Sequence, residues 1–509
     1  MPKLPPFALV DQRPPRKARP QYLIAFLLVF GIPLFLIHLQ LFSLPLFWDE
    51  LGQFVPTALD LARSGALVAH SAVPNVHPPG VAAYLALCYK LFGFSIPVTR
   101  VAMMVMATFG LLLTFLLAIE LSQGTKGAPA FFPPIFLLIS PLFYTQSMLA
   151  QLDMPAMVFT LMALLLFIKR QYVWAAAACV ALALVKETGI VAPCAFFGLL
   201  ALRREWKQAA LFAIPAAALL LGWLALLHSK TGYWLGDPAF AQYNVTYALQ
   251  PARMAIGLAR RVYYLFFSEM RCVGTLILIL TVAKCKAFHT RAWAVAAAVG
   301  VLTILLVSVF GGAELERYLL PVLPLFYIAV SVGLTALKKP LAMSAGAVMI
   351  VALGFCIVWN PPYPFPLEDN YSMVDFVHLQ QTVASFAERD LKDRKIATAW
   401  PYTAGLRNPD WGFVERRIKT VETHDLHYSS LKAVPPGSFD TLIVYTREWT
   451  PANGITGSKV FQDFLRNVYQ WEPDITAEQC RDLGLQEKIS WSVRGQRVAI
   501  FFRKTDHAD

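Results

Sequence analysis

The stretch Phe47-Trp48-Asp49-Glu50 closes the first long apolar run of the chain, which extends over residues 22–47. A run of about 26 residues is long enough to cross a bilayer with some tilt. It is too long for the core of a signal peptide and has no small-residue cleavage site, so we expect an uncleaved first span with the N-terminus inside. The acidic pair then lies at the boundary between membrane and water. We interpret the rest of the chain as a pocket built around it.

The composition predicts an integral membrane protein. Of the 509 residues, 57% are hydrophobic and only 15% are charged, whereas soluble proteins carry about 25% charged residues. The formal net charge of +12 is concentrated in short segments between apolar runs, which is the positive-inside pattern. The basic balance is therefore not interpreted as nucleic-acid binding. The seven cysteines show no spacing typical of a zinc site.

Apolar runs after the first one predict an α-helical polytopic membrane protein with about 11 transmembrane helices. These later runs cover residues 96–119, 129–146, 154–168, 172–185, 189–202, 208–228, 262–283, 292–310, 318–337 and 341–359. With the N-terminus inside, the inside connections are short and basic, as at Lys169-Arg170 and Lys338-Lys339, which agrees with the positive-inside rule. An odd number of spans places the C-terminal part outside.

Three regions follow from this layout. Residues 1–20 are rich in proline and basic residues, and we expect a disordered cytoplasmic tail. Residues 21–360 form the transmembrane domain, with loop helices on its outer face within 48–95. Residues 361–509 are long enough to bury a core of their own.

Residues 361–509 are expected to form a soluble α/β domain outside the membrane. Its predicted helices lie near 375–392 and 459–468, and its predicted strands at 395–400, 441–445, 486–493 and 497–503. The last two strands form a hairpin around Arg494-Gly495-Gln496. The domain shows no glycine-rich phosphate loop. It binds an acceptor, covers the site or has a purely structural role, and the sequence leaves these three roles open.

The ionisable residues at the outer ends of the spans fall in short outer loops. Residues 51–62 have one apolar face at helical spacing, which predicts an amphipathic helix on the membrane surface, closed by Gly65. The turn 75–80 then opens a second short helix that reaches Leu91. Later outer loops carry isolated acidic and basic residues.

Five of these loop motifs carry a resemblance to a known family. They are Asp49-Glu50, His77-Pro78-Pro79, Gln151-Leu152-Asp153-Met154-Pro155, Lys186-Glu187-Thr188-Gly189 and Arg317-Tyr318-Leu319-Leu320-Pro321. Together they make residues 20–340 resemble the GT-C glycosyltransferases, in particular the protein O-mannosyltransferases of glycosyltransferase family 39 and the lipid A aminoarabinose transferases. The resemblance implies a polyprenyl-phosphate sugar donor, an inverting transfer and a site that faces away from the cytoplasm. It also implies a bacterial inner membrane, with an envelope glycan, a lipid or a protein as the acceptor.

Sugar transfer from a lipid phosphate needs a base for the acceptor hydroxyl, and positive charge or a metal for the leaving phosphate. We assign Asp49 as the base, and the alternative is that Asp49 caps the following helix. Glu50 is a further catalytic candidate, as a pocket-orienting or metal-binding carboxylate, or else it is a solvated interfacial group. Asp153 is the third candidate, and its alternative is again a helix cap.

The candidates for binding the donor phosphate are Lys186, Arg317, His77, Arg260 and Arg261. For the cations the alternative is snorkelling to lipid headgroups at a span end. For the histidine it is stabilisation of a turn. A candidate site for a divalent metal consists of Asp49, Glu50, His77 and Asp153. No other cofactor is expected.

A polytopic lipid or glycan transporter, such as a flippase, is the alternative function. Transporters place ionisable residues near the middle of the membrane and contain internal repeats. In this chain the acidic residues lie at the outer edges of the spans, and the two halves show no repeat. The enzyme interpretation is therefore preferred, and a catalytically inactive scaffold of the same fold remains a third alternative.

Overall fold

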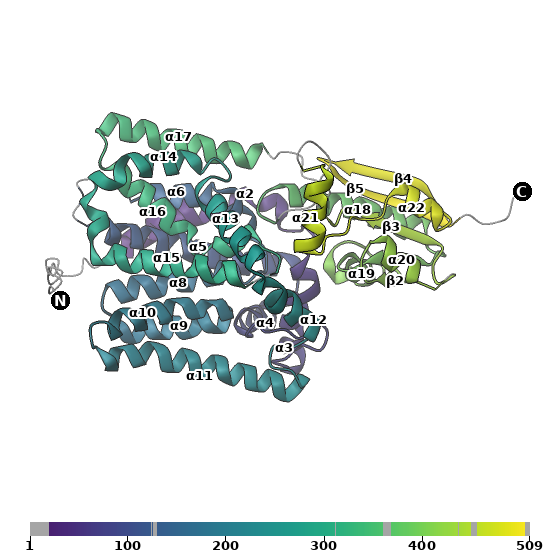
Figure 1. Ribbon diagram of the computed structural model, residues 1–509, viewed down its shortest axis with the longest axis horizontal. Coiled ribbons are helices and arrows are strands. Elements are labelled where there is room, and N and C mark those ends of the chain that lie inside the picture. Colours follow the sequence, from purple (N-terminus) through teal and green to yellow (C-terminus); the bar gives the residue numbers. More distant parts are fainter. Residues whose placement is uncertain are drawn as a thin grey trace, which may run out of the picture.

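The computed structural model describes residues 20–503, except 124, 126–129, 311, 360–367, 436 and 449–455. The predicted N-terminal tail and the proline-rich segment before the α/β domain lie almost entirely outside the described residues. A bundle of apolar helices is followed by a separate α/β domain at one end of it (Figure 1). The two-part organisation expected from the change in composition is therefore present.

The bundle consists of helices that run roughly along one direction (Figure 1). They are α1 (Pro20–Phe26), α2 (Ile32–Ile37), α5 (Ile96–Leu121), α6 (Phe132–Leu138), α7 (Pro141–Gln146), α8 (Asp153–Ile168), α9 (Tyr172–Val185), α10 (Val191–Ala201), α11 (Trp206–Thr231), α14 (Cys272–Thr281), α15 (Arg291–Val309), α16 (Leu323–Leu334) and α17 (Lys339–Val358). Among the described residues, four helices are long and apolar enough to cross a membrane, namely α5, α11, α15 and α17. The others are shorter.

Several predicted spans have different bounds in the structure. The first, expected at 22–47, is helical only as far as Leu41. The span expected at 262–283 is wrong in its first part, because residues 251–266 form the amphipathic helix α13 (Pro251–Phe266) and the apolar helix α14 starts only at Cys272. Between these two helices, Glu269 and Met270 each have a positive φ, which a continuous right-handed helix cannot contain. The span expected at 129–146 is interrupted at Ser140, directly before Pro141.

The loop helices predicted within residues 48–95 are present. They are α3 (Val55–Ser64) and α4 (Gly80–Phe92). Gly65 ends α3 in a left-handed conformation with φ of 74°, as the sequence predicted. A further short helix, α12 (Pro238–Ala241), lies in a later loop.

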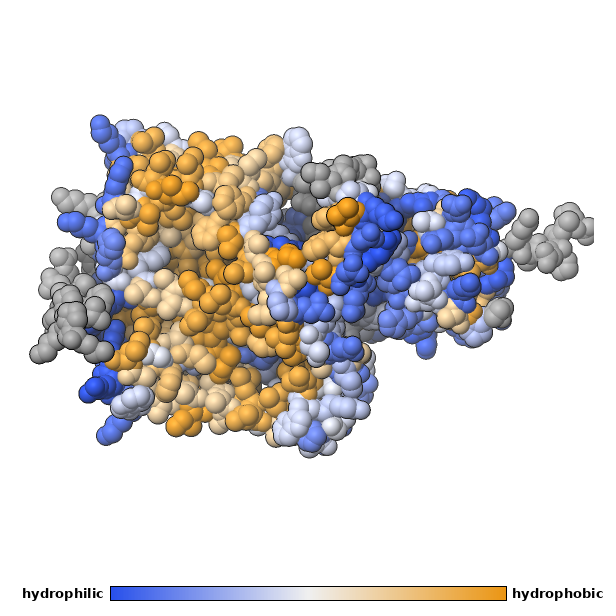
Figure 2. Space-filling model, in the orientation of Figure 1, coloured by the Kyte–Doolittle hydropathy of each residue, from blue (hydrophilic) through white to orange (hydrophobic). Residues whose placement is uncertain are grey.

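On the face seen in Figure 2, hydrophobic side chains form a broad band across the bundle. A polar rim borders it at the end away from the α/β domain (Figure 2). At that end Lys169 forms an ion pair with Glu120 at 3.1 Å, and the Trp293 ring N–H donates to the Leu121 carbonyl at 2.9 Å. The connections after α5, after α8 and before α15 therefore share one end of the bundle, opposite the α/β domain.

The α/β domain is a five-stranded sheet with the strand order β2-β1-β3-β5-β4. The strands are β1 (Ile396–Ala399), β2 (Thr420–Thr423), β3 (Thr441–Tyr445), β4 (Leu485–Val493) and β5 (Gln496–Arg503). β1 is parallel to β2 and β3, and β5 is antiparallel to both of its neighbours. The helices are α18 (Ser372–Asp390), α19 (Tyr402–Arg407), α20 (Tyr428–Ala433), α21 (Lys459–Tyr469) and α22 (Ala477–Asp482). The predicted strands and helices are confirmed, whereas β2 and three short helices were not expected.

The motif Phe47-Trp48-Asp49-Glu50 also joins the helical bundle to the α/β domain. The Phe47 ring contacts Phe376 of α18 at 6.4 Å, and the Trp48 ring contacts Trp400 at 6.2 Å. At Gly52 a β-carbon would come within 2.2 Å of the Trp400 ring, so only glycine fits under it. These contacts hold the α/β domain against the outer end of the bundle.

We predict that this end lies outside the cytoplasm. A periplasmic phosphatase reporter fused after Phe365 should be active, because the positive-inside rule keeps the basic connections in the cytoplasm. The matched control is the same reporter fused after Arg204, in a basic connection, where it should be inactive. If the reporter were active after Arg204 and inactive after Phe365, the topology would be the reverse of the predicted one.

Candidate active site

Arg317 is the centre of a charged cluster at the outer end of the bundle. Its guanidinium lies 2.6 Å from Asp49, 3.5 Å from Asp153 and 3.0 Å from Glu368. It also donates to the Gln151 side chain. These residues are far apart in the sequence and meet because each one lies at the end of a helix or in a loop on the same face.

Local structure explains how each side chain is positioned. Asp49 precedes a single π-helical turn (Glu50–Phe54) and makes no capping hydrogen bond with its side chain. Asp153 is the first residue of α8, also without a side-chain capping bond. Lys186 follows the last residue of α9, and Arg317 lies in a 3₁₀ turn (Glu316–Leu319) before α16. The helix-cap alternatives for the two aspartates are therefore not realised.

A second set of contacts extends the cluster toward the membrane. The Lys186 ammonium lies 2.6 Å from Asp153 and 4.3 Å from the centre of the Tyr318 ring. The Arg261 guanidinium lies over the same ring at 5.4 Å. The Arg317 guanidinium is also near this ring, at 5.7 Å, so three cations surround one aromatic side chain, whose face attracts positive charge.

Arg261 differs from the other arginines at the site. Its side chain is fully buried, so it does not snorkel to the membrane surface. Its Nε and Nη1 have no hydrogen-bond partner among the described residues, and Nη2 reaches only the Val307 carbonyl at 3.4 Å. A buried guanidinium without a carboxylate is costly unless an anion joins it. The geometry therefore leaves room for an anionic ligand at this position.

The carboxylates of the cluster differ in access to solvent. The Asp49 side chain is 17% exposed, whereas the Asp153 side chain is 2% exposed. An approaching acceptor can therefore reach Asp49 more easily. Burial raises the pKa of the Glu368 carboxyl to about 8, although the Arg317 guanidinium acts to lower it. Glu368 was not among the predicted site residues, because it stands in the loop before α18 with no motif around it.

Glu50 lies outside this cluster. It is fully buried and forms an ion pair with Arg100 of α5 at 2.5 Å. It also accepts from the Phe47 N–H at 3.0 Å and the Ala150 N–H at 2.6 Å. The alternative of a solvated interfacial carboxylate is therefore wrong, because Glu50 is buried, and a buried carboxylate needs such partners. The contacts give Glu50 a role in joining the first outer loop to the bundle.

Two other predicted phosphate ligands have partners of their own. His77 lies 2.8 Å from Glu187, beside the loop that carries Lys186. Arg260 lies 2.9 Å from Glu314 and donates to the Tyr264 hydroxyl at 2.7 Å. Neither side chain is directed by these contacts into the cluster around Arg317.

The four candidate metal ligands are distributed over separate pairs. Asp49 faces Arg317, Glu50 faces Arg100, Asp153 faces Lys186 and His77 faces Glu187. In the part of the chain that the structure describes, no three His, Cys, Asp or Glu side chains gather as a metal-binding group. The four residues therefore do not form one ligand set in this arrangement.

An apolar pocket opens beside the second set of contacts. Its walls come from α8, α9, α10 and α15, and Lys186, Asp153 and Tyr318 lie at its polar end. The remaining lining includes Ala156, Val191, Val299 and Val307. The pocket has a volume of only about 20 Å³, so it marks the place where apolar walls meet charged groups and is not itself large enough for a lipid tail.

Comparisons with known proteins agree with this architecture. The sequence profile of glycosyltransferase family 87 matches residues 75–310, and a search of curated proteins found no match. The crystal structure of ArnT from Cupriavidus metallidurans in the apo state shares the fold, with a TM-score of 0.54, 12% identity, and coverage of 94% of this chain and 98% of that chain. ArnT bound to undecaprenyl phosphate gives a TM-score of 0.51, 13% identity, and coverage of 96% and 99%. The apolar helices, the family 87 profile over residues 75–310 and the shared fold make this chain similar to membrane glycosyltransferases of the GT-C type.

Proposed function

We propose that the protein transfers a sugar from a polyprenyl-phosphate donor to an acceptor on the extracytoplasmic face of the membrane. The observation that carries the proposal is the pair of buried cations, Lys186 and Arg261, beside the ring of Tyr318, and Lys186 and Tyr318 lie at the polar end of an apolar pocket. A polyprenyl phosphate has this combination of an anionic head and an apolar tail. The structure of ArnT bound to undecaprenyl phosphate, a protein with the same fold, supports this class of donor.

The phosphate would lie between Lys186 and Arg261. Both cations are buried, where a charge-assisted hydrogen bond is stronger than in water. Lys186 is held by Asp153, and Arg261 has unused donors. The pair therefore stabilises the negative charge that remains on the phosphate when the sugar leaves.

Asp49 would act as the base. The acceptor oxygen attacks the anomeric carbon while its proton passes to Asp49, and the bond between that carbon and the phosphate oxygen breaks. This single displacement inverts the anomeric configuration. Arg317 forms ion pairs with three carboxylates, so we assign it the role of positioning Asp49 rather than binding phosphate. Glu368 and Gln151 complete its surroundings.

Removal of Arg261 tests the donor site. Arg261→Leu should weaken binding of undecaprenyl phosphate by about 10- to 100-fold, because a charge-assisted contact contributes about 1.5–3 kcal/mol. The matched control is Arg260→Leu, the next residue on α13, which is paired with Glu314 and should bind the lipid normally. Binding is measured on the purified protein in detergent by native mass spectrometry.

A stability measurement separates this role from a structural one. In the absence of lipid, Arg261→Leu should not lower the unfolding temperature, because it removes a buried charge that has no carboxylate partner. A large fall in that temperature would indicate a structural arginine. Unchanged lipid binding in Arg261→Leu would refute the phosphate site.

A further inference from the structure

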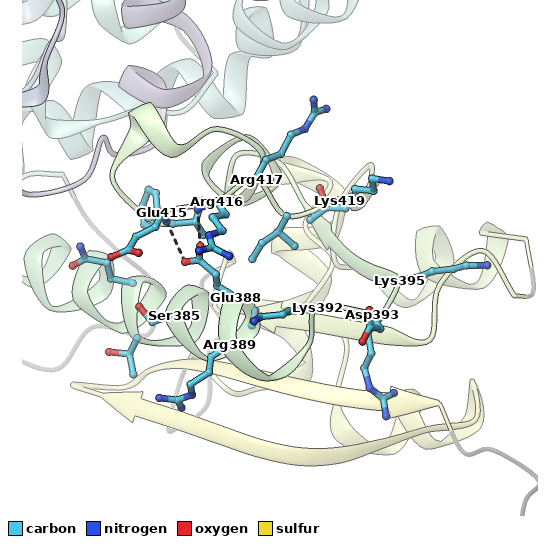
Figure 3. A pocket seen from close by; sticks show the side chains of 18 of the residues that line it. Ser385, Glu388, Arg389, Lys392, Asp393, Lys395, Glu415, Arg416, Arg417 and Lys419 are labelled. Atoms are coloured by element: carbon cyan, nitrogen blue, oxygen red, sulfur yellow. Dashed lines mark hydrogen bonds between the residues drawn. The ribbon is translucent and has the colours of Figure 1, made fainter.

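A groove lined by many basic side chains lies on the α/β domain (Figure 3), and its lining shares no residue with the charged cluster around Arg317. It has a volume of about 1290 Å³ and is lined by α18, the loop that follows it, and the segment 412–421. A pocket for one small ligand occupies about 300–1,000 Å³. This groove is therefore large enough for an extended ligand.

The groove carries an excess of positive charge. Seven arginines and lysines line it against three carboxylates. One of the three, Glu388, is used within the protein, since it accepts from the backbone N–H groups of Glu415 and Arg416 at 3.1 and 2.6 Å. Five cations of the lining form no ion pair among the described residues, namely Lys392, Lys395, Arg416, Arg417 and Lys419.

The groove starts at the membrane domain and leads away from it. At one end Gly412 lies against the bundle, where a β-carbon would come within 2.8 Å of Ile96. At the other end Lys395 and Lys419 immediately precede the parallel strands β1 and β2. Since Trp400, after the far end of β1, packs on Trp48 of the membrane domain, the two lysines lie about one strand length, roughly 13 Å, from that contact.

The lining of the groove offers two kinds of polar group. Near the membrane, α18 contributes neutral polar side chains at helical spacing, including Gln381, Thr382 and Ser385. Such groups form hydrogen bonds with sugar hydroxyls. The unpaired cations continue from Arg416, on the side of Ser385, to Lys395 at the opposite end (Figure 3), and they match phosphate, sulfate or carboxylate groups.

We propose that this groove binds an anionic glycan, a carbohydrate chain with phosphate or carboxylate groups, and holds it as the acceptor. That the bound glycan is the acceptor rests on the proposed transferase function, whereas binding of the glycan requires no turnover. Phospholipid headgroups offer the same anionic chemistry, but they are confined to the membrane plane, whereas the groove extends beyond it.

The test measures binding to the full chain in phosphatidylcholine nanodiscs, without donor. The probe is a sulfated dextran oligosaccharide, and neutral dextran of the same length serves for comparison. The variant Arg416→Ala/Arg417→Ala/Lys419→Ala should bind the sulfated probe about tenfold more weakly, since exposed ion pairs contribute modestly and add up. The matched control, Lys459→Ala/Arg481→Ala/Lys488→Ala, removes three exposed cations of the same domain outside the groove and should bind like the unaltered protein.

Equal binding of the probe by both triple variants would overturn the proposal, as would equal binding of neutral and sulfated dextran. Nanodiscs that also contain phosphatidylglycerol identify the competing occupant. If this lipid displaced the probe from the unaltered protein, the groove would be a headgroup site and the proposal would be wrong. The binding measurement does not depend on sugar transfer. A protein that bound the probe but transferred no sugar would therefore support the glycan-binding groove and refute the transferase mechanism.

Discussion

Asp49→Asn should lower turnover by at least about 100-fold while the protein remains folded and continues to bind donor. A general base contributes about 10²–10⁴ in rate, and the amide cannot accept the proton. The shape is kept, and the amide oxygen can still accept from Arg317, which lies 2.6 Å away in the native pair. The Asp49 side chain makes no helix-capping hydrogen bond, so the substitution removes no cap. Turnover is measured with a polyprenyl-phosphate sugar, and folding by thermal unfolding in detergent.

Asp153→Asn is the matched control for the base. Asp153 is 2% exposed and holds Lys186 at 2.6 Å, so its loss should raise the KM for the donor more than it lowers kcat. If Asp153→Asn abolished kcat while Asp49→Asn retained near-normal turnover, the base would be Asp153. The two substitutions thus separate proton transfer from placement of the phosphate-binding lysine.

Arg100→Ala should destabilise the protein by about 3–5 kcal/mol, because it leaves the Glu50 carboxylate buried without its cation. Arg100 also donates to the carbonyls of Leu44, Pro45 and Met148 at 3.0–3.1 Å. Its loss therefore frees several buried acceptors at once. Stability is measured as the unfolding midpoint in detergent, together with the fraction of monodisperse protein.

The control for this prediction is Arg63→Ala, an exposed arginine at the end of α3. Its effect should remain within about 0.5 kcal/mol, as for most surface substitutions. If Arg100→Ala kept full stability and lost only activity, Glu50 would belong to the chemistry rather than to the scaffold. Asp49 and Glu50 would then both take part in catalysis, although the structure gives them separate contacts.

Features that depend on local pattern could be predicted from the amino-acid sequence. Hydropathy gave the apolar helices, because a bilayer-spanning segment must be continuously apolar over its own length. Gly65 marked the end of α3 through its left-handed conformation, and the alternation around Gly495 marked the hairpin of β4 and β5. The grouping of Asp49, Asp153, Lys186 and Arg317 at one end also followed, since span topology decides which helix ends share a face.

Only the tertiary structure decided which charges pair. Glu50 and Asp49 are neighbours in the chain, yet one is buried against Arg100 and the other faces Arg317. Arg260 and Arg261 are likewise neighbours, and the helical rotation of about 100° between them turns one toward Glu314 and buries the other beside Tyr318. Glu368 enters the cluster from beyond the last span. Ion pairing depends on distances of a few ångströms between segments far apart in sequence, and no local periodicity records those distances.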